Sequence, residues 1–163
     1  MAQRSSTAGV ARLVASVTIA APRERVFAYL DDPALMKQWI AGLEEVVFDK
    51  PGIPRAAGTA FRQKIRGLGR SREYAGEFIA YRPPHEIGTR LARTRFAIEV
   101  THRLASAEGG TRIEQIAALR FPGWPARVTG GIPGWLLRRR MAKALARLKS
   151  VVEGAAGSAA GRP

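Results

Sequence analysis

The sequence predicts one α+β domain in which a seven-stranded curved antiparallel sheet wraps around a single long C-terminal helix. Three observations predict this fold class. The chain has 163 residues, of which 46% are hydrophobic, and this suits one domain with a substantial core. From Glu44 to Phe121 apolar residues mostly alternate with polar ones, which is the pattern of strands. From Pro133 to Glu153 they recur every three or four residues, which is the pattern of an amphipathic helix.

The N-terminal part should form a strand and two short helices. Residues 1–9 are small and polar, and we expect a flexible terminus. Apolar side chains then alternate from Val10 to Ala21, which indicates a half-buried strand. Pro22 suits the first turn of a helix that closes at Asp31-Asp32-Pro33, and residues 33–40 favour a second short helix.

Six further strand candidates follow, separated by short turns rich in glycine and proline. Because short connections join antiparallel neighbours, these strands should form a meander. The candidates are residues 44–49, 59–65, 72–81, 86–93, 96–104 and 111–121. A sheet with one apolar face needs a cover, and the helix from Pro133 is long enough to supply it.

We expect the C-terminal helix to end at Gly154, since glycine commonly follows the last helical turn. Residues 154–163 are mostly glycine, alanine and serine, and we expect them to be a disordered tail. Residues 10–153 would then form a single domain, which we expect to bind a ligand.

Several segments resemble the SRPBCC superfamily, which includes START-related lipid-transfer domains, polyketide cyclase/dehydrase-like proteins and relatives of the birch-pollen allergen. They are Val17–Pro22, Val26–Pro33, Trp39 and Phe78–Pro84. The resemblance covers roughly Val10 to Glu153. It implies a helix-grip fold with a deep cavity between the sheet and the C-terminal helix, used for hydrophobic or amphipathic small molecules. Some members are enzymes, many bind or carry ligands and others contact partner proteins, so the fold does not select a function.

Alternation along the strands predicts which side chains line such a cavity. Gln63, His102 and Gln115 fall on otherwise apolar inward faces. Burying an unpaired amide or imidazole costs about 1–3 kcal/mol, so these side chains need hydrogen-bond partners. The partners could be one another, solvent at the strand ends, buried water or a ligand. The predicted ligand-contacting residues of the sheet are Phe61, Gln63, Tyr74, Phe78, Ile98, Val100, His102 and Gln115. Those of the C-terminal helix are Leu137, Met141 and Leu145.

The strand candidate 72–81 is ambiguous because both of its faces carry aromatic residues. Tyr74 and Phe78 share one face, whereas Ile79 and Tyr81 share the other. We predict that Tyr74 and Phe78 point inward, because two glutamates lie on the opposite face.

The sequence contains no recognisable metal or cofactor motif. It has two histidines and no cysteine, which is too few ligands for a zinc site. Gly67-Leu68-Gly69 lies between two strand candidates and is a turn rather than a phosphate loop. His102 is a candidate acid/base for a cyclase/dehydrase-type reaction, with Tyr74 or Gln115 positioning an oxygen. No second titratable group clearly shares the face of His102 to orient it.

The chain is strongly basic, with 27 Lys and Arg against 13 Asp and Glu and a net charge of +14. Such charge attracts anions of any kind, although an Arg-rich composition bias would produce the same excess. The C-terminal helix carries a basic cluster of Arg138, Arg139, Arg140, Lys143 and Arg147.

Trp124 and Trp135 flank the glycines and prolines that precede this cluster, and they are candidates for a gate or a membrane-contacting lip. Cations beside tryptophans favour contact with an anionic ligand or membrane. A solvated helix face is the simpler alternative. Few aromatic residues interleave with the basic ones, so we do not expect nucleic-acid binding.

Three functions remain open. The favoured one is non-enzymatic binding or transport of a hydrophobic or amphipathic small molecule or lipid, which is anionic if the basic charge is functional. The second is a cyclase/dehydrase-type enzyme, a lyase or isomerase, that uses His102. The third is a module that binds a partner or membrane through the basic helix. No apolar run reaches the ~20 residues of a membrane span and no cleavable signal is evident, so we expect a cytoplasmic protein. The sequence does not predict the oligomeric state.

Overall fold

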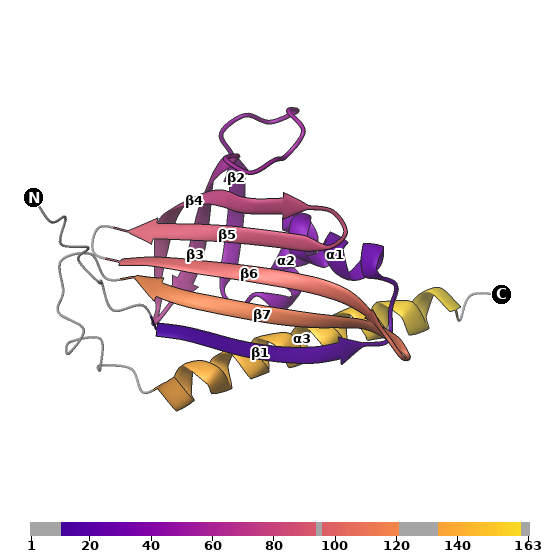
Figure 1. Ribbon diagram of the computed structural model, residues 1–163. Coiled ribbons are helices and arrows are strands. Elements are labelled where there is room, and N and C mark those ends of the chain that lie inside the picture. The colour runs from indigo at the N-terminus through magenta and orange to yellow at the C-terminus, as the bar shows by residue number, and fades with distance from the viewer. Residues whose placement is uncertain (1–10, 94–95, 121–133, 161–163) are drawn as a thin grey trace, which may run out of the picture.

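The computed structural model describes residues 11–93, 96–120 and 134–160. These ranges form a curved seven-stranded antiparallel sheet with three helices (Figure 1). In chain order the elements are β1 (Ala11–Ile19), α1 (Arg23–Asp31), α2 (Pro33–Trp39), β2 (Leu43–Phe48), β3 (Ala60–Gly67), β4 (Arg70–Arg82), β5 (Glu86–Arg93), β6 (Phe96–Ala107), β7 (Gly110–Arg120) and α3 (Gly134–Ala160). Each strand and helix predicted from the sequence is present, so the α+β helix-grip fold is confirmed.

The strands lie in the order β1-β7-β6-β5-β4-β3-β2, and every neighbouring pair is antiparallel. β2 to β7 form the predicted meander, whereas β1 pairs with the last strand, β7. Leu13 lies opposite Ala117 and Val17 lies opposite Ile113. Because opposite residues of paired strands share a face, these apolar side chains form a common surface for a helix to cover.

The long helix α3 supplies that cover and lies along β1 (Figure 1). Polar contacts fix its C-terminal half to the end of that strand. Lys149 Nζ donates to the carbonyl oxygen of Thr18 at 2.8 Å. The Ala20 N–H donates to Glu153 Oε1 at 2.7 Å. The buried residues of the helix, which match the predicted apolar stripe, are Met141, Leu145, Leu148 and Val152.

The predicted end of this helix at Gly154 is wrong, because α3 continues to Ala160. Residues 154–160 are therefore helical and not a disordered tail. A glycine inside a helix costs only about 1 kcal/mol, and the alanine-rich residues that follow have the highest helix propensity. Residues 1–9, Pro133 and residues 161–163 lie outside the described residues, so the flexible N-terminus remains a prediction.

The short helices α1 and α2 pack against each other and against α3, and α2 also contacts the edge strand β2 (Figure 1). Asp32 lies between them and caps α2, since its Oδ1 accepts a hydrogen bond of 2.7 Å from the Ala34 N–H. The buried Trp39 Nε1 donates to the carbonyl oxygen of Tyr29 at 2.8 Å. This bond ties the end of α2 to α1 and orients the indole ring.

A β-bulge at Ile79 explains why the faces of β4 were ambiguous from sequence. The register of β4 with β5 shifts between Phe78 and Ala80 and leaves Ile79 without a partner. The extra residue reverses the alternation, so Phe78 and Tyr81 both face the core and their ring centroids are 5.3 Å apart. The inward direction of Phe78 is confirmed, whereas the assignment of Tyr81 to the outer face is wrong.

Leu148 tests whether α3 is an integral part of the core, because its side chain is 0% exposed. Leu148→Ala should lower the free energy of unfolding by about 3 kcal/mol, since it removes buried contacts and leaves a void. Ser150→Ala, at an exposed site of the same helix, should change it by less than about 0.5 kcal/mol. Urea unfolding measures both changes, and equal effects of the two substitutions would contradict the described core.

Candidate functional site

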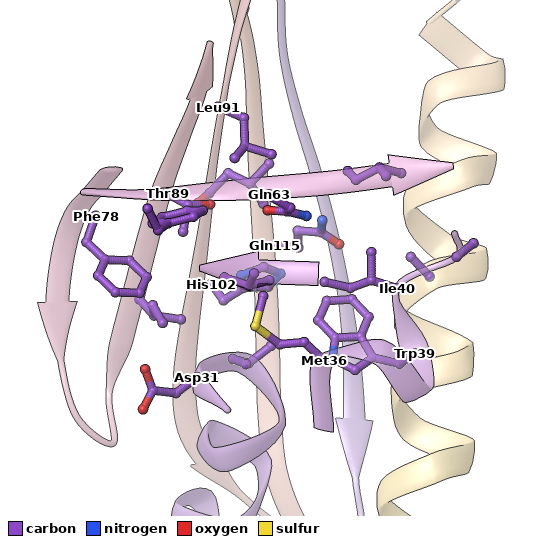
Figure 2. A pocket seen from close by; sticks show the side chains of 18 of the residues that line it. Asp31, Met36, Trp39, Ile40, Gln63, Phe78, Thr89, Leu91, His102 and Gln115 are labelled. Atoms are coloured by element: carbon purple, nitrogen blue, oxygen red, sulfur yellow. The ribbon is translucent and has the colours of Figure 1, made fainter. Parts of the chain in front are cut away.

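A cavity of about 250 Å³ lies between the inner face of the sheet and the helices α1 and α2 (Figure 2). Most of its wall is apolar and much of it is aromatic, with Trp39, Phe48, Phe61 and Phe78 among the lining residues. The rings of Phe61 and Phe78 lie 5.3 Å apart between centroids. Phe61 can lie over β4 only because Gly76 is opposite, where an added Cβ would come within 2.4 Å of its ring. This wall of the cavity is therefore closely packed.

The sequence predicted that α3 would form a large part of this wall, and the structure does not agree. Among the described residues of α3, Ala144 alone lines the cavity. Leu137 and Met141 pack instead with Leu13 and Ala117, and Leu145 belongs to the main core. These side chains cannot reach the cavity because α3 follows β1, at the far edge of the sheet from β2 and β3. The cavity thus lies chiefly between the sheet and α1 and α2.

Most of the lining predicted from the sheet is present. The predicted residues that line the cavity are Phe61, Gln63, Phe78, Val100, His102 and Gln115. Tyr74 and Ile98 do not line it, although Tyr74 lies opposite Gln63 in the sheet and so shares its face. Alternation identifies the face on which a side chain lies, but it does not locate the ends of a cavity along that face. Sequence reasoning missed the contribution of the two short helices, which is Leu30, Asp31, Met36 and Trp39, with Ile40 and Ala41 directly after α2.

Three neutral polar side chains, Gln63, His102 and Gln115, gather on the strand wall of the cavity (Figure 2). Their exposed fractions are 5%, 9% and 8%, so all three are buried. His102 and Gln115 lie directly opposite each other on β6 and β7. Among the described residues, none is a hydrogen-bond partner for His102 Nε2 or Gln115 Oε1, both of which are buried atoms. Of the alternatives left open by the sequence, mutual pairing and exposure at strand ends therefore fail for these two atoms.

The surroundings of His102 keep its imidazole neutral. Burial disfavours the charged form and lowers the pKa of His102 from 6.5 to about 4. The imidazole ring is perpendicular to the ring of Trp39, 6.1 Å away between centroids, and this apolar neighbour offers no counter-charge. At neutral pH the side chain is thus an uncharged donor and acceptor at the cavity wall.

An acidic group at the edge of the cavity was missed by sequence reasoning. Asp31, the last residue of α1, lines the cavity, and Arg55 Nη1 lies 2.5 Å from its Oδ1. Arg55 Nη1 also donates to the Asp31 carbonyl oxygen at 2.5 Å, whereas Oδ1 accepts no hydrogen bond from the described residues. The pair is therefore held by charge at the carboxylate and by a hydrogen bond at the main chain.

Two aromatic residues complete this edge. Tyr81 Oη donates to Asp31 Oδ2 at 3.2 Å, and partial burial together with the Asp31 carboxylate raises the pKa of Tyr81. The Arg55 guanidinium also lies over the ring of Phe48, 4.8 Å from its centroid. From sequence, Asp31 was assigned only to a helix end, and no spacing signal connects it with Arg55 in the loop between β2 and β3.

The basic cluster of α3 lies on the surface, away from the cavity wall. Its members, Arg138, Arg139, Arg140, Lys143 and Arg147, are all exposed. Trp135 is 64% exposed and is not part of the cavity lining, and Trp124 lies outside the described residues. Across the ranges that the structure describes, no group of three or more His, Asp or Glu side chains could hold a metal ion. None of the described helices has the length and apolar character needed to cross a membrane.

Comparisons with known proteins identify relatives of this fold. The family model described as polyketide cyclase / dehydrase and lipid transport matches residues 10–153. A crystal structure of a protein from Rhodobacter sphaeroides is 26% identical, with a TM-score of 0.70 over 88% of this chain and 92% of that one. Ara h 8.0201 is 14% identical, with a TM-score of 0.68 over 89% and 97% of the two chains.

The di-domain ARO/CYC StfQ from the steffimycin biosynthetic pathway is 12% identical, with a TM-score of 0.67 over 91% of this chain and 52% of that one. This chain thus spans about half of StfQ. At such low identities Ara h 8.0201 and StfQ are evidence of a shared fold alone. No curated protein shows significant sequence similarity to the chain.

The buried imidazole predicts a pH dependence of stability. The unfolded chain gains a proton at His102 near pH 6.5, but the folded protein gains it only near pH 4. Stability should therefore fall as the pH decreases through this window, by up to about 3 kcal/mol from this group. Urea unfolding at pH 7.5 and pH 4, compared between the wild type and His102→Gln, isolates the contribution. A titration of His102 near pH 6.5 by NMR would contradict its burial as a neutral group.

Proposed function

The chain belongs to the polyketide cyclase / dehydrase and lipid transport family of the SRPBCC superfamily, and on this basis we propose that it binds a hydrophobic small molecule in the cavity between the sheet and α1 and α2. The observation that carries the proposal is an apolar cavity of about 250 Å³ with a few buried polar groups on one wall. A mostly apolar pocket with convergent polar side chains is the usual form of a small-molecule site.

The size of the cavity favours a compact ligand. A protein cavity of roughly 150 Å³ lined by apolar side chains holds benzene. A volume of about 250 Å³ therefore suits a ligand of one or two rings, or a part of a longer lipid.

The lining also favours a ligand without charge. It contains no Lys or Arg among the described residues, and its one carboxylate, Asp31, is already paired with Arg55. The anionic ligand suggested by the net charge of +14 thus has no counter-charge inside the cavity.

The same chemistry favours binding over a cyclase/dehydrase-type reaction with His102 as the acid/base. A general base is most effective when its pKa is near the working pH, whereas the pKa of His102 is lowered to about 4. Such an imidazole is a weak base at neutral pH. It can still orient a bound ligand by hydrogen bonding, and binding requires no proton transfer.

Ala144 offers a direct test of the cavity, because it is the point where α3 reaches the lining. Ala144→Phe should place a ring in the cavity and weaken binding of the neutral fluorescent two-ring probe 1-naphthylamine by at least about 10-fold. Ala146→Phe, at an exposed position of the same helix, is the matched control and should leave binding unchanged. Probe titrations measure both variants, with thermal unfolding to verify folding. Equal binding by folded Ala144→Phe and wild type, or no binding of any apolar probe by the wild type, would refute the proposal.

A second candidate function is peripheral contact with an anionic membrane, and the arrangement of α3 favours it. Trp135, Arg139, Lys143 and Arg147 follow one another at intervals of four residues and are exposed, so they form one ridge along the helix. Within the described part of the chain no acidic side chain pairs with Arg139 or Lys143. Arg147 Nε donates to the carbonyl oxygen of Gln38 at 3.1 Å. A ridge of exposed cations beside an exposed tryptophan suits anionic head groups.

Replacement of the three ridge cations Arg139, Lys143 and Arg147 by Gln should weaken binding to phosphatidylcholine vesicles that contain phosphatidylserine by at least about 10-fold. The reason is that each cation near an anionic surface contributes about 1 kcal/mol. Vesicle sedimentation at low and physiological salt measures this effect.

The matched control replaces three other exposed cations, Lys50, Arg70 and Arg72, by Gln, and it removes the same charge from a different surface. Equal losses for the two triple variants would indicate net charge rather than the ridge. Wild-type binding that does not depend on phosphatidylserine would refute membrane contact. Binding of a DNA duplex or a protein partner through the same ridge, with none to vesicles, would do so as well.

A further inference from the structure

The unpartnered pair His102 and Gln115 identifies the chemical class of the ligand. We propose that the cavity selects neutral compounds that carry a hydroxyl group, such as phenols and small alcohols, and that it binds this hydroxyl group between His102 and Gln115. The inference rests on the proposed binding function and adds the polar group that the ligand must carry.

The geometry of the sheet places both side chains within reach of a single ligand atom. His102 and Gln115 are directly opposite residues of β6 and β7, so their Cβ atoms are about 5 Å apart and point to the same face. Both residues line the cavity (Figure 2), and His102 Nε2 and Gln115 Oε1 are buried atoms with no hydrogen-bond partner in the described part of the chain. Because these positions lie on paired central strands, the backbone holds the two groups in fixed positions.

The hydrogen-bonding capacities of the two atoms restrict what can satisfy both. Gln115 Oε1 only accepts, so the ligand must donate a hydrogen bond to it. The same ligand oxygen can accept a hydrogen bond from His102 when Nε2 carries the proton of the neutral ring. A hydroxyl group performs both roles at once. A carbonyl or ether oxygen cannot donate and would leave Gln115 Oε1 unpaired.

Charge excludes the other small groups that could make these bonds. A carboxylate cannot donate, and the described cavity lining offers no cation to stabilise it. An ammonium group could donate to Gln115, but it would have to be buried against apolar and aromatic walls with only the paired Asp31 nearby. The remaining alternative is a buried water molecule that bridges the two side chains. A bridging water would give no preference for a hydroxyl-bearing ligand.

A matched series of two-ring compounds tests the inference with the full-length protein. The series is naphthalene, 2-naphthol and 2-naphthoate, with dissociation constants measured by isothermal titration calorimetry at pH 7.5. We expect 2-naphthol to bind about 10- to 100-fold more tightly than naphthalene, because naphthalene leaves both buried atoms unpaired. A purely apolar cavity would show the opposite order, since naphthalene is the more hydrophobic compound. 2-Naphthoate should bind most weakly.

Three variants locate the effect within the cavity. His102→Phe and Gln115→Leu should each abolish the preference for 2-naphthol while they retain naphthalene binding. Gln63→Leu is the matched control: it removes a neighbouring buried amide from the same wall and should keep the preference. If a His102 or Gln115 variant fails to fold by thermal unfolding, the wild-type series still decides the question.

The outcomes separate this inference from the proposed function. Naphthalene binding equal to or tighter than 2-naphthol binding would overturn the hydroxyl selection and leave small-molecule binding intact. Tightest binding of 2-naphthoate would overturn the neutrality of the ligand. Retention of the preference in both Gln115→Leu and His102→Phe would overturn the assignment of the site. No binding of any of the three compounds would overturn both the inference and the proposed function.

Discussion

The need to cover the apolar inner face of a curved sheet governs this structure. One long helix is available for that purpose, and its buried face packs along β1 with Lys149 and Glu153 bonded to the end of that strand. A helix about 10 Å across cannot also cover β2 to β5 at the other side of the sheet. That surface is left to the short helices α1 and α2. They close it without filling it, and the cavity is the space that remains.

The sequence was informative wherever a periodic pattern determined the structure. Alternation placed Gln63, His102 and Gln115 on the inner face, and the helical spacing identified the stripe of α3 that packs on the sheet. It failed where geometry depends on a local irregularity or a distant contact. The bulge at Ile79 changes the phase of β4 with no sequence signal of its own.

Two further features required three-dimensional information. The contact of Asp31 with Arg55 joins a helix end to a loop between two strands, and no spacing rule predicts such a pair. The exclusion of Leu137 and Met141 from the cavity depends on where α3 crosses the sheet. Sequence periodicity indicates which face of a helix is buried, but it does not indicate which part of the sheet that face meets. The helix continuation past Gly154 reflects the small cost of Gly154 and Gly157 beside four alanines.

The buried polar side chains of the cavity wall, Gln63, His102 and Gln115, come from three strands, β3, β6 and β7. A point mutation at His102 or Gln115 changes only a side chain of this wall and leaves the main-chain bonds of the sheet in place. Such a site can diversify in evolution one residue at a time. The fold itself depends little on these side chains, and it persists in StfQ at 12% identity with this chain.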